Sequence, residues 1–171
     1  MELIITDKAY RSILDECLAA PKTETGGILI GKKIDKHRLV VPFALGPGLK
    51  ARKSWIRYSP DVEWQQIYLE KLFDRYGINY VGSYHRHPGY SCLPSGPDFE
   101  AACRIVTDPE WNVQEAIFPI INLAGNRINF HPYYFTRRLM VFQLIGWRIV
   151  SHKDQLIKRV LKRGNQCSQK S

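Results

Sequence analysis

The stretch Gly82–Asp98, GSYHRHPGYSCLPSGPD, carries two histidines one residue apart and, eleven positions after the second, an aspartate. Residues 78–81, INYV, precede it and predict a buried strand that ends at Pro88. Side chains alternate across a strand, but the twist of its last residues and the proline can turn His85 and His87 toward one point. Two imidazoles and a carboxylate suit zinc and leave a fourth position for water, as in catalytic sites. The stretch therefore predicts a metal centre.

Taken alone, an HxH pair at a strand end is more often a hydrogen-bonded pair of histidines than a metal site. Two further features favour the metal. Ser95 precedes Asp98 by three residues and is also a good N-cap for a helix expected to begin at residue 96 or 97. Far upstream, Glu24 stands before two glycines in the stretch ETGGILIG, where a glutamate has no evident structural duty.

In this order and spacing, these elements resemble the JAMM (JAB/MPN) metalloprotease signature: a glutamate, HxH, seven residues, a serine, two residues and an aspartate. The matching residues are Glu24, His85, His87, Ser95 and Asp98. The strand GGILIG and the glycine before the histidines resemble the prokaryotic JAB branch, and the resemblance covers about residues 1–135. One position departs, because the family usually has Ser or Thr where this chain has Arg86. Since the middle residue of HxH should point away from the metal, we expect the site to be retained.

The resemblance implies both a fold and a role for each signature residue. The fold is a single three-layer α/β domain, a mixed β-sheet flanked by helices, of the JAB/MPN and cytidine-deaminase-like type. One Zn²⁺ per chain is expected on His85, His87 and Asp98. Glu24 is expected to act as general base and then acid, and Ser95 to donate a hydrogen bond to the oxyanion of the tetrahedral intermediate.

The implied activity is hydrolysis of the amide bond after the C-terminal glycine of a ubiquitin-like protein, in deconjugation or in precursor processing. A bacterial antiphage conjugation system is the expected setting, with the ubiquitin-like protein or its conjugates as partners, and with activating and conjugating enzymes as further candidates. The alternative within the enzyme class is a peptidase for sulfur-carrier-like proteins or small peptide conjugates in biosynthesis. The alternatives outside it are a scaffold, against which the complete signature argues, and a basic nucleic-acid-binding module.

Composition agrees with one globular domain of 171 residues. The N-terminus lacks the pattern of a signal peptide, and no run of about eighteen apolar residues occurs, so we expect a cytoplasmic protein with no membrane partner. The four cysteines are scattered without a CxxC, which indicates neither a zinc knuckle nor a disulfide framework. Cys92 lies between the ligands, but we interpret it as a packing residue.

The net charge of +9 is concentrated near the C-terminus, where residues 136–171 hold nine basic side chains and one acidic side chain. The catalytic body is therefore nearly neutral. Charge runs are mostly solvated helix faces, and no aromatic-interleaved nucleic-acid motif accompanies this one. Nucleic acid is accordingly an unlikely partner.

Along the chain, periodicity and turn residues predict alternating strands and helices. The expected strands are residues 3–5, 28–30, 38–45, 54–58, 115–123 and 127–134, with a strand pair over 139–150 broken near Gly146. The expected helices are 7–20 after the N-cap Thr6, 59–76 starting at Ser59 and ending at Gly77, 97–107 and 153–163. The predicted division is a catalytic domain over 1–135, a basic extension over 136–163 packed on it, and a disordered tail over 164–171.

Substrate selection is expected from the loops at 46–53, which carries three basic residues, and 109–114. Arg86 is expected to pair with a neighbouring acidic side chain or, in the alternative, to contact a substrate carbonyl.

Overall fold

The computed structural model describes residues 1–54, 58–89, 91–124 and 127–162. Within these ranges the strands are β1 (Glu2–Thr6), β2 (Thr25–Lys33), β3 (Arg38–Leu45), β4 (Arg52–Lys53), β5 (Tyr58–Ser59), β6 (Asn79–Arg86), β7 (Glu115–Ala124), β8 (Arg127–Thr136), β9 (Gln143–Leu144) and β10 (Gly146–Val150). The helices are α1 (Asp7–Ala19), α2 (Val62–Tyr76), α3 (Gly96–Thr107) and α4 (Gln155–Leu161).

Eight of the strands form one mixed sheet in the order β10-β1-β3-β2-β6-β7-β8-β9, and β4 pairs with β5 in a separate ribbon. β1 lies parallel to both β10 and β3, and β6 lies parallel to β7. β2 is antiparallel to both β3 and β6, and β7 and β8 form an antiparallel hairpin. β2 and β6, the strands next to the signature residues, are thus central in the sheet.

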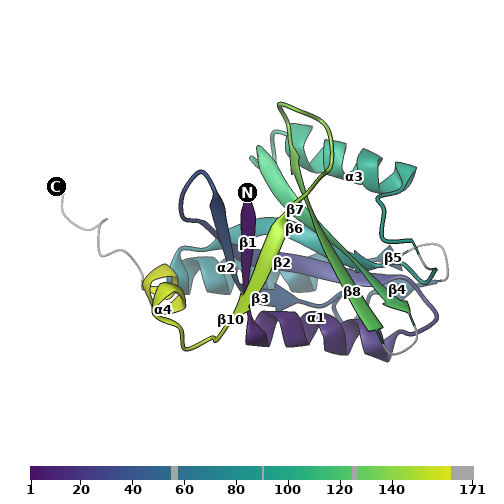
Figure 1. Ribbon diagram of the computed structural model, residues 1–171, viewed down its shortest axis with the longest axis horizontal. Coiled ribbons are helices and arrows are strands. Elements are labelled where there is room, and N and C mark those ends of the chain that lie inside the picture. Colours follow the sequence, from purple (N-terminus) through teal and green to yellow (C-terminus); the bar gives the residue numbers. More distant parts are fainter. Residues whose placement is uncertain (55–57, 90, 125–126, 163–171) are drawn as a thin grey trace.

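Helices cover both faces of the sheet, which gives three layers (Figure 1). α1 packs on one face through Ile13 and Cys17, in a core shared with β2 and β7. The other face is covered by α2 and α4, which share a core with β1 and β3, and by α3, which packs on β7 and β8 through Ala102 and Val106. The prediction of a three-layer α/β domain with a mixed sheet is confirmed.

The two ends of the strand order are joined by consecutive residues. Leu144 of β9 pairs with β8, Ile145 donates its N–H to the carbonyl of Pro132, and β10 begins at the next residue beside β1. The sheet therefore curls around α1, as Figure 1 shows where β8 and β10 converge. Aromatic rings fill the space inside this curl: Trp147 lies 5.4 Å from Tyr10 and 4.6 Å from Phe130, measured between ring centroids.

Three of the four helix caps predicted from the sequence are found in the structure. Thr6 accepts a hydrogen bond from the backbone of Ala9, and Gly77 ends α2 in the left-handed conformation. The prediction of Ser59 as the start of α2 is wrong. Ser59 pairs with Arg52 in the β4–β5 ribbon, and the N-cap is Asp61, whose carboxylate accepts from the backbone of Trp64.

Other boundaries differ by a few residues. β2 begins at Thr25 rather than at 28, because its glycines are part of the strand: a Cβ on Gly27 would lie 1.9 Å from the carbonyl oxygen of Leu45. α4 is shorter than the expected helix over 153–163. The strand expected over 54–58 and the tail over 164–171 fall mostly or wholly outside the described residues. None of the helices described combines the length and apolar character needed to cross a membrane.

Candidate metal centre

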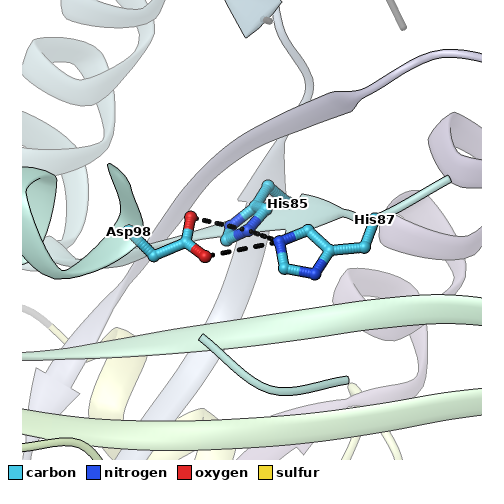
Figure 2. A group of neighbouring side chains, drawn as sticks. All are labelled: His85, His87 and Asp98. Atoms are coloured by element: carbon cyan, nitrogen blue, oxygen red, sulfur yellow. Dashed lines mark hydrogen bonds and ion pairs between the residues drawn. The ribbon is translucent and has the colours of Figure 1, made fainter. Parts of the chain in front are cut away.

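Three side chains from two elements converge at the C-terminal end of β6 (Figure 2). The Nε2 atoms of His85 and His87 are 2.7 Å apart, and they lie 3.1 and 3.4 Å from the two carboxylate oxygens of Asp98. The side chains are 13 to 20% exposed, so they are shielded by protein on most sides but reachable from solvent. In the part of the chain that the structure describes, they are the group of His, Cys, Asp and Glu that could hold a metal ion.

The two histidines share a face because they are two residues apart on one strand. β6 is still in register with β7 at His85, which pairs with Ile120, and the N–H of His87 donates to the carbonyl of Ile121 at 3.0 Å. This bond carries the extended conformation one residue past the end of β6. Strand alternation alone thus turns both imidazoles to the face that carries α3, and Arg86 to the face that carries α1.

Asp98 reaches the histidines from the first turn of α3. Ser95 is the N-cap of this helix and forms a capping box with Asp98. The Asp98 carboxylate accepts from the Ser95 backbone N–H and from the Ser95 hydroxyl, both at 2.6 Å. The predicted N-cap at Ser95 is confirmed, and the cap also fixes the direction of the carboxylate.

The spacing of these atoms fits a tetrahedral metal ion. Metal–ligand bonds of roughly 2.0–2.1 Å at tetrahedral angles put ligand atoms about 3.3 Å apart. The two histidine–aspartate separations of 3.1 and 3.4 Å are close to this value, and the separation of 2.7 Å between the imidazoles needs only a small opening. Two imidazoles and one carboxylate form a known set of three protein ligands for catalytic zinc.

The electrostatics of the three side chains favour a positive charge between them. Burial raises the pKa of the Asp98 carboxyl, but hydrogen bonds from His85 and His87 outweigh burial and hold that pKa well below its usual range. Burial lowers the pKa of His87, yet the hydrogen bond and charge of Asp98, with a further contribution from Glu24, raise it overall.

A second layer of contacts orients the ligands. Nδ1 of His87 lies 3.3 Å from the carbonyl oxygen of Ser91, so an Nδ1–H there leaves the Nε2 lone pair free for a metal. Asn122, fully buried in β7, donates to the carbonyl of Gly89 and ties down the loop after the histidines. Our sequence interpretation missed Asn122, although a polar residue inside the apolar run FPIINLA is a signal of such a role.

Glu24 lies directly before β2, next to the ligands but not among them. Thr25 pairs with Arg86 in antiparallel register, and the same register continued by one residue places Glu24 opposite His87. The charge of Glu24 contributes to the raised pKa of His87. The backbone N–H of Glu24 donates to the carbonyl of Ser54 at 2.9 Å. The strand pairing thus brings a residue sixty-one positions before His85 to the metal centre.

Arg86 and Cys92 lie near the ligands without joining them. As expected, Arg86 points away from the metal centre, but the expectation that it pairs with an acidic side chain or meets substrate is wrong. Its side chain is 3% exposed, and its guanidinium donates to backbone carbonyls of residues 20, 21 and 23. Cys92 accepts a hydrogen bond from Tyr133 through its backbone carbonyl, and its thiol is not one of the clustered ligand atoms.

A cavity of about 650 Å³ lies on the same side of the sheet, between α2, the start of β6 and residues 110–115. It is toward the opposite end of β6 from the histidines, so it is separate from the metal centre. Tyr80 lines it, and the Tyr80 hydroxyl lies 3.2 Å from the hydroxyl of Ser83, which shares a strand face with His85. Most of the 109–114 segment that we expected to select substrate lines this cavity.

Fold and ligand set together define a mixed α/β domain with a candidate His-His-Asp metal centre at the end of a central strand. The sequence model of the family described as prokaryotic homologs of the JAB domain matches residues 6–139, and the chain belongs to this family. The family predicted from the signature is thereby confirmed.

Two curated proteins illustrate the relationship. A probable metalloprotease, y4qB, from Sinorhizobium fredii is 26% identical over 148 residues, which cover 82% of this chain and 89% of that protein. The CD-NTase/cGAS isopeptidase from Enterobacter hormaechei is 30% identical over 123 residues, covering 70% of this chain. The match spans 66% of that isopeptidase's own length.

Among solved structures, the solution structure of protein DSY2949 from Desulfitobacterium hafniense has a similar fold. The TM-score is 0.66, at 18% sequence identity, and the match covers 87% of this chain and 93% of that one. This similarity supports the fold and carries no information on activity.

Proposed function

We propose that the protein is a zinc-dependent metalloprotease of the isopeptidase type, which hydrolyses the amide bond after the C-terminal glycine of a ubiquitin-like protein. The observation that carries this proposal is the convergence of His85, His87 and Asp98 beside Glu24. The names of the two curated relatives, a probable metalloprotease and an isopeptidase, support a hydrolase that acts on amide bonds.

His85, His87 and Asp98 would hold the metal and leave one coordination position open toward solvent. A zinc ion in such a site supplies a nucleophile at neutral pH, because it lowers the pKa of a bound water to roughly 7. Neighbouring residues of the chain orient the side chains that would bind the metal. Ser91 holds the His87 ring through Nδ1, and Ser95 holds the Asp98 carboxylate.

Glu24 is proposed as the residue that moves the proton. Its carboxylate takes the proton of the attacking water and delivers it to the leaving amine nitrogen when the amide C–N bond breaks. It stands outside the ligand set and opposite His87, so it stays available as a base. General acid–base work of this kind accelerates a reaction by roughly 10²- to 10⁴-fold.

Ser95 has two roles to reconcile. Its hydroxyl donates to Asp98 at 2.6 Å, which orients a metal ligand. We infer that this hydroxyl, which has a single proton and rotates about its C–O bond, turns its donor from Asp98 to the oxyanion when that forms on the substrate carbonyl. Loss of the first role weakens metal binding, whereas loss of the second lowers kcat with the metal still bound.

The substrate class is inferred from the isopeptidase relative and from the family. A ubiquitin-like protein joined through its C-terminal glycine to a lysine, or to a short extension, presents the amide that this centre would hydrolyse. The relative's name, CD-NTase/cGAS isopeptidase, supports a protein conjugate as the substrate. We propose a bacterial antiphage setting, with activating and conjugating enzymes as partners. A sulfur-carrier-like protein, which ends in a similar glycine tail, is the second candidate substrate.

Two segments that border α2 are the proposed substrate contacts. The loop over 46–53 is tied to the start of α2, because Asp61 accepts from the backbone of Lys50 and Gln65 donates to the carbonyl of Gly46. The segment over 110–114 lines the cavity that the side chains of α2 also line. A ubiquitin-like body resting on α2 would touch both segments while its tail reached the metal centre.

The test is cleavage of a ubiquitin-like protein fused at its C-terminal glycine to a reporter. Wild type, Glu24→Ala and chelator-treated enzyme are compared, the last with and without added zinc. We expect cleavage by wild type, loss in both controls, and recovery when zinc is returned to the chelated wild type. Zinc-loaded wild type that cleaves neither ubiquitin-like nor sulfur-carrier-like fusions would falsify the proposal.

A further inference from the structure

Arg86 is a buried charge whose two Nη atoms are bonded to backbone carbonyls rather than to an acid, whereas its buried Nε has no hydrogen-bond partner among the described residues. Its side chain is 3% exposed, and within the described residues no carboxylate pairs with it. Nη1 donates to the carbonyl oxygens of Ala20 at 2.7 Å and Thr23 at 3.0 Å, and Nη2 donates to that of Pro21 at 2.6 Å. Burying a guanidinium costs free energy unless its donors are hydrogen-bonded. The turn must therefore keep these three carbonyls in place for the buried charge to be tolerated.

The three acceptors belong to one short turn with a defined position. They lie between the end of α1 at Ala19 and the start of β2 at Thr25. Ala20 is the C-cap of α1, and its carbonyl also accepts from the backbone N–H of Thr23, whereas Pro21 and Thr23 lie beyond the helix. α1 has no basic residue in its own last turn, so Arg86 supplies the positive charge that this end of the helix favours.

The last residue of this turn is Glu24. Of the four residues before it, all except Lys22 accept a hydrogen bond from Arg86 through their backbone carbonyls. Arg86 stands between the two histidines in the sequence. Glu24 itself is held by its N–H bond to Ser54, and Thr25 is held by its pairing with β6. The strand segment that holds the two histidines therefore also holds Arg86. Arg86 in turn anchors the turn that ends at the proposed base, Glu24.

Geometry explains why arginine suits this position. The planar guanidinium presents donors in a fixed fork and so reaches acceptors that point in different directions. A lysine ammonium could meet one or two of the three carbonyls from a single point. A serine or threonine, which the family usually has at this position, is too short to reach a turn across the sheet.

We propose that Arg86 is a positioning residue for Glu24: by clamping residues 20–23 it fixes the proposed general base over the metal ligands. This inference rests on the proposed function for the role of Glu24. Arg86 itself contacts neither metal nor substrate. Because a misplacement of about 1 Å can cost on the order of 10²-fold in rate, a loosened turn should lower kcat while zinc stays bound.

The first experiment is a double-mutant cycle on the cleavage reaction. Arg86→Ala should lower kcat about 10²-fold, with little change in KM and with wild-type zinc content. In a Glu24→Ala background the same substitution should have almost no further effect, because the group that it positions is gone. Arg86→Lys should lie between wild type and Arg86→Ala, and Arg148→Ala, an exposed arginine on β10, is the matched control.

Rescue and proteolysis test the clamp itself. Guanidinium ion added to Arg86→Ala should restore part of the lost kcat, which a general loss of stability would not allow. Lys22 is exposed within the turn, so trypsin should cut after it faster in Arg86→Ala than in wild type. The trypsin assay needs no substrate and no metal.

Three results would overturn the proposal. They are wild-type kcat in Arg86→Ala, an equal loss of rate from Arg86→Ala in the presence and absence of Glu24, and unchanged cutting after Lys22. If Arg86→Ala does not fold, Arg86→Lys carries the same cycle and the same trypsin assay. A wild-type enzyme that cleaves no substrate counts against the proposed function alone, and in that case the trypsin rate still decides whether Arg86 holds the turn.

Discussion

The hydroxyl and the backbone N–H of Ser95 both donate to one carboxylate oxygen of Asp98, each at 2.6 Å. The same carboxylate faces the Nε2 atoms of His85 and His87. The capping box at the start of α3 and the third proposed metal ligand therefore share the Asp98 carboxylate. The start of this helix and the binding of the metal should accordingly change together when either residue is altered.

The first prediction concerns Ser95→Ala. Removal of an N-cap hydroxyl costs about 1 kcal/mol of stability, and loss of a contact that orients a metal ligand weakens metal affinity by roughly 10- to 100-fold. Thermal unfolding and competition with a coloured chelator measure the two effects. Ser12→Ala, which removes an exposed hydroxyl from α1, is the control and should change neither. Unchanged metal affinity in Ser95→Ala would rule out the role of Ser95 in orienting the metal ligand and leave its capping role and its proposed role at the oxyanion.

The second prediction concerns Asp98→Asn. A ligand that binds only the folded state adds about 2.7 kcal/mol at a hundredfold excess over its Kd, so zinc should raise the Tm of wild-type protein. Asp98→Asn removes the anionic ligand, and we expect its Tm to stay constant as zinc is added. Asp74→Asn, on the exposed face of α2, should respond like wild type. A zinc-dependent Tm in Asp98→Asn would place the ion elsewhere.

The third prediction concerns the strand that carries the histidines. Gly82 has a φ of 154°, and a Cβ there would lie 1.9 Å from the carbonyl oxygen of Ile117 on β7. Gly82→Ala must therefore push β6 away from β7, and we expect a loss on the order of 3 kcal/mol or more, measured by urea unfolding. Gly146→Ala, at the start of β10 with open space around it, should change stability little. Equal stabilities for the two variants would contradict this account of β6.

The fourth prediction is a loss of stability in alkali. Burial raises the pKa of the Cys17 thiol to about 12, from 9.0 when exposed. The folded state therefore keeps its proton at pH values where the unfolded state has lost it. The resulting stabilisation is complete below about pH 9 and is lost as the pH rises toward 12, by up to about 1.4 kcal/mol per pH unit.

Urea unfolding at a series of alkaline pH values measures this slope. Cys17→Ala should be less stable than wild type at neutral pH, because it leaves a small cavity between α1 and the sheet. Its stability should, however, fall less steeply above about pH 9. Parallel curves for the two proteins would show that the thiol does not contribute to the pH dependence.

Much of the geometry of the candidate metal centre could be predicted because its determinants are local. A spacing of two residues puts His85 and His87 on one strand face whatever the rest of the chain does, and Ser95 followed by Asp98 forms a capping box wherever a helix begins. Gly77 likewise marks the end of α2 by its own conformation. These features depend on a few neighbouring residues, which the sequence displays directly.

Features that depend on distant partners could not be predicted. Arg86 finds its acceptors in a turn more than sixty residues earlier, and backbone carbonyls leave no mark in the sequence. Asp61 displaced Ser59 as the N-cap because Ser59 was drawn into pairing with β4. In both cases, the partner of Arg86 and the N-cap of α2, a tertiary contact chose between possibilities that the local sequence does not distinguish.

The curl of the sheet around α1 sets a practical limit on where the chain can be cut. The family match ends at residue 139, yet β10 supplies one neighbour of the N-terminal strand, and Trp147 packs against Tyr10 and Phe130. A fragment that stopped at 139 would bare one hydrogen-bonding edge of β1 and an aromatic surface, both of which promote aggregation. Protein intended for crystallisation or assay should therefore run at least through Val150, and preferably to the end of α4.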